Sequence, residues 1–328
     1  MTEKRNVSIQ LLRVCACIMV FIVHFGQRVG LSGVIRSFTN FGQFGVQLFL
    51  LISGFLACKT FFEKPNFNIW GYYKKRMIAI LPLYYLVIIY YFITENILNK
   101  FIDVIPTDAL GVGWFRYIFL LNGFLNSDTY FWSNLGITWT IPIFMFFYLI
   151  APFILPKVKS ITSAVSVWII IFVITHIIDN YYTCTIFNNL HILFLGAALY
   201  ICAHHKQEKP ASIFLLLAAI CMIVLSKSEY AFVFIFSCII LVLFSIDNLC
   251  LHRRLQTIIN VFDKYSYTLY LMHGVVFCSV IDRLNKLDVP KILIAVLAIL
   301  GTGLATWLVG KFIEKPIQNL LKKHFINK

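Results

Sequence analysis

Residues 8–27 read SIQLLRVCACIMVFIVHFGQ, and runs of this kind decide the fold. A helix needs about 20 mostly apolar residues to cross the hydrocarbon core of a bilayer. Comparable runs recur along the whole chain, and the pattern predicts an all-α, polytopic transmembrane helix bundle of about ten spans. The expected spans are residues 8–27, 41–62, 77–94, 135–155, 161–178, 189–203, 211–226, 230–247, 265–281 and 292–313.

The composition leaves little material for a water-soluble domain. Hydrophobic residues make up 60% of the 328 positions and charged residues 13%, whereas a soluble domain has about 25% charged residues. We therefore expect a single membrane domain over residues 1–328. The first run resembles a signal peptide, but Arg13 and His24 interrupt it and no cleavage site follows. We expect it to be retained as the first helix.

The formal net charge of +14 is carried by Lys and Arg residues between the apolar runs. There they would contact membrane lipid headgroups and set the topology. One further apolar segment, residues 109–125, is short and contains glycines and Arg116. If it does not span, the basic residues concentrate on one side, which predicts that both termini are cytoplasmic. No basic face is combined with stacking aromatics in a polar domain, so nucleic acid is not expected as a partner.

Arg13 and His24 lie 11 residues apart on the first expected helix. At 100° per residue they share one face, roughly 16 Å apart along the axis. An Arg inside a span costs at least ~2.5 kcal/mol, which favours an orientation toward the bundle interior or water. The alternative is that Arg13 reaches back to the cytoplasmic headgroups and His24 marks the outer interface.

His24 is also the side chain best suited to move a proton near neutral pH. It could deprotonate a hydroxyl or itself carry an acyl group. Neither a Ser-His-Asp arrangement nor zinc-type His and Cys spacing is evident, and most of the nine Cys residues lie inside apolar runs. We expect no metal.

Three other clusters have both a structural and a functional interpretation. Ser53-Gly54 allows close approach of a helix or of a ligand. The cations Lys74-Lys75-Arg76 are either a topological anchor or a docking site for a cytoplasmic polyanion such as coenzyme A. Tyr265 to His273 combines an interfacial aromatic belt with a polar group inside a span.

These residues, taken in order, resemble acyltransferase family 3. The motifs are Arg13 and His24, Ser53-Gly54-Phe55-Leu56, the basic run that ends at Pro82, Tyr265-Ser266-Tyr267 with Tyr270-Leu271 and His273, and Ile313-Glu314-Lys315-Pro316-Ile317. The resemblance covers nearly the whole chain. It implies transfer of an acyl group, usually acetyl, from cytoplasmic acyl-CoA to a hydroxyl of an envelope polysaccharide or lipid-linked glycan. No permanently bound cofactor and a bacterial inner-membrane location are implied with it.

By the same resemblance, His24 would be the catalytic residue and Arg13 its companion. The acyl-CoA site would include Arg76, with Lys75, Ser53 and Gly54 as further candidates, and Tyr267, His273 and Glu314 are other candidate site residues. Two positions depart from the family pattern. Ala79 stands where a second Arg is common, and Phe144 stands where an acidic residue is common, so the donor contacts and the acceptor class stay open.

The competing function is a transporter or export component for a glycan. Its permeation path would be lined by the face that carries Arg13 and His24. The expected spans lack the midplane carboxylates that a proton-coupled carrier often uses, and no inverted repeat is visible. The enzyme is therefore the favoured interpretation.

Overall fold

The computed structural model describes residues 6–63, 67–94, 113–124, 135–204, 228–245, 251–287 and 289–326. Helices account for nearly all of these residues, and no strand occurs among them, so the predicted all-α fold is confirmed. The α-helices are α1 (Val7–Arg28), α2 (Gly33–Asn40), α3 (Gly45–Glu63), α4 (Ile69–Ile93), α5 (Gly113–Ile118), α6 (Thr140–Ile154), α7 (Ile161–Tyr181), α8 (Thr185–His204), α10 (Ser228–Ser245), α11 (Arg253–Lys264), α12 (Ser266–Met272), α13 (Ser279–Asn285), α14 (Lys291–Val309) and α15 (Lys315–Phe325).

Short 3₁₀ and π segments join several of these helices. The 3₁₀ segments are η1 (Phe41–Phe44), η3 (Leu121–Gly123), η4 (Leu135–Trp139) and η5 (Leu155–Lys157). The π-helical segments are η6 (His273–Cys278), which connects α12 to α13, and η7 (Gly310–Glu314), which connects α14 to α15. π-Helical turns are often found at functional sites.

Seven helical stretches in the described residues are long and apolar enough to cross a membrane. They correspond to the predicted spans in α1, α3, α4, α6, α7, α8 and α14. The apolar part of α10 is shorter, at Ala231–Leu243, and the span predicted at 265–281 is formed by α12, η6 and α13 together. The span predicted at 211–226 lies outside the described residues, so the count of ten stays a prediction.

The described part of segment 109–125 does not span. It forms α5, of six residues, and η3, of three residues. Leu120 between them has a left-handed backbone with φ of 59°, a conformation that ends a right-handed helix. This part of the chain therefore agrees with the predicted peripheral placement.

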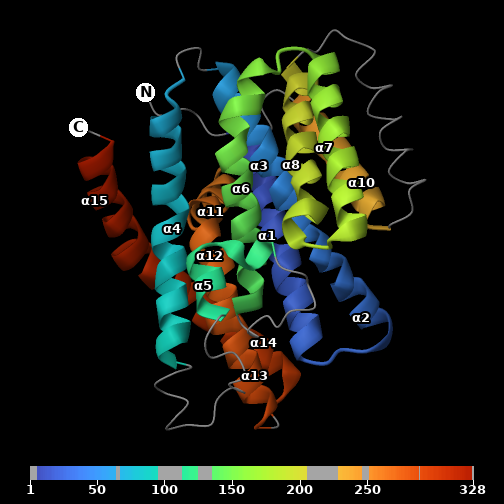
Figure 1. Ribbon diagram of the computed structural model, residues 1–328. Helices are drawn as coiled ribbons and strands as arrows, with labels where there is room; N and C mark the ends of the chain where they lie inside the picture. Colours follow the sequence, from blue (N-terminus) through green and yellow to red (C-terminus); the bar gives the residue numbers. More distant parts are fainter. Residues whose placement is uncertain are drawn as a thin grey trace.

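Helices α3 and α8 form the centre of the bundle and lie side by side (Figure 1). The Leu193 carbonyl occupies the place where a Cβ on Gly54 would be, and the Leu51 carbonyl does the same for Gly196. Only glycine permits this backbone approach. In the most apolar part of each span, 72% of the residues of α8 are buried, against 28% for α7 and 22% for the stretch that begins with α14. Helices α7 and α14 therefore expose most of their apolar surface on the outside of the bundle.

Helix α1 runs antiparallel to α3 and is also packed through glycines. The carbonyls of Met19 and Ala16 press against Gly42 and Gly45 respectively. Helix α4 follows α3 after a short connection, so α1 begins at the end of the bundle where α4 begins. We call this the basic end, because it carries Lys74, Lys75 and Arg76, and His24 therefore lies toward the opposite end.

Candidate active site

Two histidines from distant parts of the chain face each other inside the bundle. The ring centroids of His24 on α1 and His273 at the start of η6 are 5.0 Å apart, and the rings are tilted by 35°. His273 is fully buried, whereas His24 is partly exposed. His24 is therefore partly accessible and has a second imidazole behind it.

The hydrogen bond of His273 defines which of its nitrogens carries the proton. Its Nδ1 contacts the Tyr270 carbonyl. A carbonyl only accepts hydrogen bonds, so Nδ1 donates, and in the neutral ring Nε2 then presents a lone pair. The Nε2 atom is buried and has no hydrogen-bond partner among the residues that the structure describes. The inner imidazole is thus set to accept a hydrogen bond.

Aromatic rings enclose the histidine pair on the bundle side. Phe21 lies 5.5 Å from the His273 ring and 4.9 Å from Phe277, and Tyr270 lies 5.3 Å from His273. The Tyr270 hydroxyl is 2.8 Å from Thr140 Oγ1 and donates to the Ile137 carbonyl. These contacts fix the ring that precedes His273 and keep water from the inner side of the pair.

Arg13 shares the face of His24, as predicted, but the structure does not bring the two together. Its Nη1 lies 2.8 Å from Asp263 Oδ1 on α11, and Gln10 Nε2 donates to the other oxygen of Asp263 at 3.2 Å. Asp263 is almost completely buried, with 1% of its side chain exposed, against 33% for Arg13. Arg13 thus neutralises a buried carboxylate between α1 and α11.

Sequence reasoning missed Asp263 as a partner of Arg13. The available signal was an acid in an otherwise basic helix, placed after the expected span 230–247 and before 265–281. Its role in catalysis, like that of Arg13, stays a prediction. What the contact explains is how a cation inside the first helix is compensated, because an unpaired charge at this depth is costly.

The end of α1 beyond His24 is tied to α13. Arg28 forms a salt bridge with Asp282, and Asn285 Nδ2 donates to the Arg28 carbonyl at 2.7 Å. On the other side, Arg36 Nη1 donates to the Gly26 carbonyl at 2.7 Å. Arg28 and Arg36 together hold the end of α1 that carries His24.

At the basic end, Arg76 lies between two tyrosine rings. Its guanidinium carbon is 4.4 Å from the centroid of Tyr148 on α6 and 5.3 Å from that of Tyr72. Stacking of this kind orients a planar guanidinium. Arg76 is therefore a positioned cation rather than a mobile one.

A cavity of about 360 Å³ opens beside Arg76's helix turn, between α3, the start of α4 and the end of α15. Lys74 and Lys75 line it together with the exposed ring of Trp70. Lys74 Nζ also donates to the Phe325 carbonyl at 3.1 Å. The cavity offers two cations and a flat aromatic surface, which suits an anionic ligand with a ring system.

The other predicted site residues are placed apart from this cavity. Gly54 faces the Leu193 carbonyl in the contact of α3 with α8, and Ser53 is its half-buried neighbour. Both lie about two helical turns from Thr60, the α3 residue that lines the cavity. Close helix packing accounts for Gly54, and a role for either residue with acyl-CoA stays a prediction.

Tyr267 and Glu314 belong to a network that joins the late motif to the closing motif. The Tyr267 hydroxyl donates to the Ile80 carbonyl at 2.7 Å. Glu314 accepts from Thr268 and, at 3.0 Å, from Gln318. The two motifs, far apart in sequence, thus pack against each other and against α4. No contact in this network reaches His24.

The comparison with known proteins agrees with the architecture of a polytopic helix bundle. A family profile described as an acyltransferase domain, that of acyltransferase family 3, matches residues 6–311. The chain belongs to this family. No curated protein and no solved structure matched the chain. The family and the apolar helices together identify a multi-pass membrane acyltransferase.

Proposed function

We propose that the protein transfers an acyl group, most simply acetyl, from cytoplasmic acyl-CoA to a hydroxyl of an envelope glycan. The observation that carries the proposal is the placement of His24. It is a partly exposed imidazole, inside a membrane acyltransferase, backed by a second imidazole whose buried Nε2 has no hydrogen-bond partner among the described residues. A thioester donor needs a proton-transfer group and positioning, and this pair supplies the first.

In the proposed reaction, His24 accepts the proton of the acceptor hydroxyl. The hydroxyl oxygen attacks the thioester carbonyl, the carbon–sulfur bond breaks, and the leaving thiolate of CoA takes up a proton from His24. His273 Nε2 accepts a hydrogen bond from the other ring nitrogen of His24 and so stabilises the imidazolium while it exists. The overall step conserves protons.

The donor is proposed to bind at the basic end. The phosphates of CoA would contact Lys75 and Arg76, and the adenine would lie against Trp70 in the cavity there. The basic end would face the cytoplasm, because membrane proteins usually carry an excess of basic residues on their cytoplasmic side. The acceptor would then approach His24 from the opposite end, and the acyl group would cross the bilayer within the bundle.

The experiment that tests this function uses NMR of surface polysaccharide. We expect O-acetyl signals from wild-type cells, their loss from a strain in which the gene is deleted, and their return on complementation. A deletion strain with unchanged O-acyl signals and an altered amount of surface polysaccharide would instead support the export component.

A substitution at the basic end tests the donor site. Arg76→Ala removes the stacked guanidinium, and we expect the KM for acetyl-CoA in inside-out membrane vesicles to rise roughly tenfold or more, as for loss of a hydrogen bond to a charged group. Arg76→Lys keeps the charge but not the planar fork, so we expect an intermediate KM. Arg283→Ala, an exposed residue on α13, is the matched control. An unchanged KM in Arg76→Ala would contradict the donor site.

A further inference from the structure

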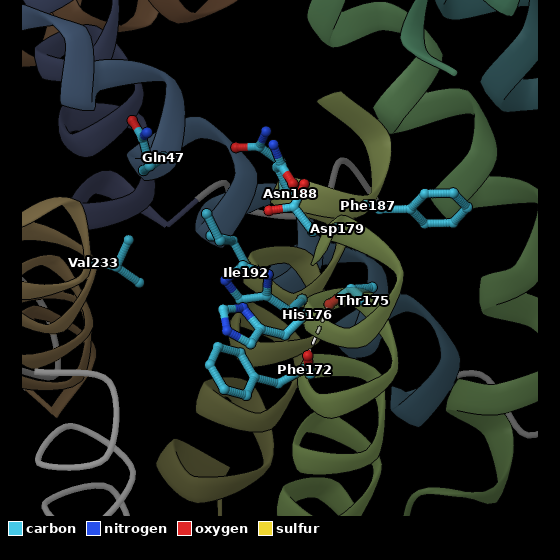
Figure 2. Close-up of a pocket in the computed structure, with 11 residues that line it drawn as sticks. Gln47, Phe172, Thr175, His176, Asp179, Phe187, Asn188, Ile192 and Val233 are labelled. Carbon is cyan, nitrogen blue, oxygen red and sulfur yellow. Dashed lines mark hydrogen bonds between the residues drawn. The ribbon is translucent and has the colours of Figure 1, made fainter. Parts of the chain in front are cut away.

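A second, smaller polar chamber lies on the far side of α3 from the histidine pair. It has a volume of about 60 Å³ and is formed by residues of α3, α7, α8 and α10. Figure 2 shows Gln47 on α3 across from Asp179 and Asn188. The chamber lies at the outer ends of α3, α7 and α8, opposite the basic end.

Three oxygens of the lining are buried without a hydrogen-bond partner among the described residues. They are Gln47 Oε1, Asp179 Oδ1 and Asn188 Oδ1. A buried polar atom left unpaired costs free energy, so such a group usually serves water or a ligand. Three of them around one chamber, from three different helices, indicate that the chamber is built to be occupied.

The chemistry of these atoms restricts the occupant. Acceptor oxygens require a partner that donates hydrogen bonds, and the carboxylate of Asp179 disfavours an anion. The described residues contain no group of three or more His, Cys, Asp or Glu side chains that could hold a metal ion. A hydroxyl group donates and also accepts, so it satisfies Gln47 and Asn188 in either orientation of their amides.

The imidazoles and an aromatic ring complete this environment. His176 and His191 line the chamber, and the Phe172 ring lies 5.8 Å from His176 in a stacked arrangement and 5.2 Å from His191. The volume corresponds to about four water molecules. It is too small for a whole sugar ring but has room for a hydroxymethyl arm or a pair of hydroxyls.

The position of the chamber relative to His24 follows from α3. Gln47 is two residues beyond Gly45, which contacts α1, and two residues turn a helix by about 200°. The chamber and His24 are therefore on opposite sides of α3, both toward the outer end of the bundle. An acceptor that contacts both sites must therefore extend past α3, which a polymer can do and a single small molecule cannot.

We propose that the chamber lined by Gln47, Asp179 and Asn188 binds a hydroxyl-bearing arm of the carbohydrate acceptor at a unit that does not react. This proposal rests on the proposed function, since it assumes a glycan acceptor. It assigns these three residues to acceptor recognition, separate from the histidine pair and from the donor cavity.

The test measures initial rates with the purified full chain in nanodiscs. The acceptor is the producing cell's own surface polysaccharide after alkaline removal of its esters, and the donor is acetyl-CoA. We expect Asn188→Leu to raise the KM for polysaccharide about threefold to tenfold through the loss of one hydrogen bond. We expect a similar rise for Asp179→Asn, because an amide oxygen accepts a weaker hydrogen bond than a carboxylate. The KM for acetyl-CoA should stay at the wild-type value. Asn180→Leu, an exposed neighbour on α7, is the matched control.

A binding measurement separates this proposal from the proposed function. Calorimetric titration of the same polysaccharide into His24→Ala protein, alone and combined with Asn188→Leu or Asp179→Asn, needs no turnover. Weaker binding on adding Asn188→Leu supports the chamber even if the wild type transfers no acyl group, in which case only the proposed function fails. Wild-type KM and unchanged binding in both chamber variants would overturn the proposal. A second result would also overturn it. If sodium stabilised the protein more than choline did, and Asp179→Asn abolished this difference without changing polysaccharide binding, the chamber would be a cation site.

Discussion

Replacing His24 by Ala is expected to lower acyl transfer to polysaccharide by about 10²- to 10⁴-fold, the usual contribution of a general base. His24 is a partly exposed imidazole that contacts the buried imidazole of His273. Its loss removes the proton acceptor without disturbing the glycine contacts that pack α1. The measurement is the O-acetyl content of surface polysaccharide by NMR, with protein in the membrane followed by immunoblot.

The matched control for this substitution is His252→Ala. His252 is an exposed residue that caps α11 and is remote in sequence from the histidine pair. We expect this variant to O-acetylate at close to the wild-type level. If His24→Ala protein, present in normal amount, also acetylates at that level, His24 is not the catalytic residue and the proposed mechanism is wrong.

The second large effect is expected at His273, which we describe as a positioning residue because it acts through His24. If His273 Nε2 accepts a hydrogen bond from His24, the bond strengthens when His24 becomes an imidazolium. A hydrogen bond to a charged group contributes about 1.5–3 kcal/mol, which corresponds to a fall in kcat of roughly tenfold to hundredfold when it is removed. The KM values for both substrates should change little.

Two substitutions of similar size distinguish this role from simple packing. The amide oxygen of Gln can be placed near the former Nε2 position, whereas the shorter Asn reaches only as far as Nδ1. We therefore expect His273→Gln to keep clearly more activity than His273→Asn, although both alter the buried site. Equal loss in the two variants, at equal protein level, would mean that His273 only fills space behind His24.

The common face of Arg13 and His24 was predictable because an α-helix has a fixed rotation per residue. That periodicity could not tell the function of Arg13 from the function of His24. The structure shows that one end of this face meets Asp263 on α11 and the other meets His273 on η6. Neither partner could be assigned from spacing, because both contacts join residues about 250 positions apart.

The same distinction holds for the glycines and the basic residues. Ser53-Gly54 predicted that another helix or a ligand comes close to this part of α3, and the structure shows that α8 does so. Lys74-Lys75-Arg76 predicted a polyanion site or an anchor, and the structure adds the two tyrosine rings that hold Arg76. The chamber around Asp179 and Asn188 had no sequence signal, since its polar residues come from separate helices and follow no motif.

The sequence by itself determined that this chain is an all-α membrane protein of the acyltransferase family 3 type. Hydrocarbon thickness requires apolar runs of about 20 residues, and backbone groups in lipid must be satisfied within helices. Only the tertiary structure decided which polar groups meet inside the bundle. Such pairings depend on how helices pack and rotate against each other, and the apolar sequence of a span constrains that rotation weakly. The stretch at residues 8–27 therefore specified a membrane helix, whereas the bundle decided that its histidine faces a second histidine and its arginine a buried aspartate.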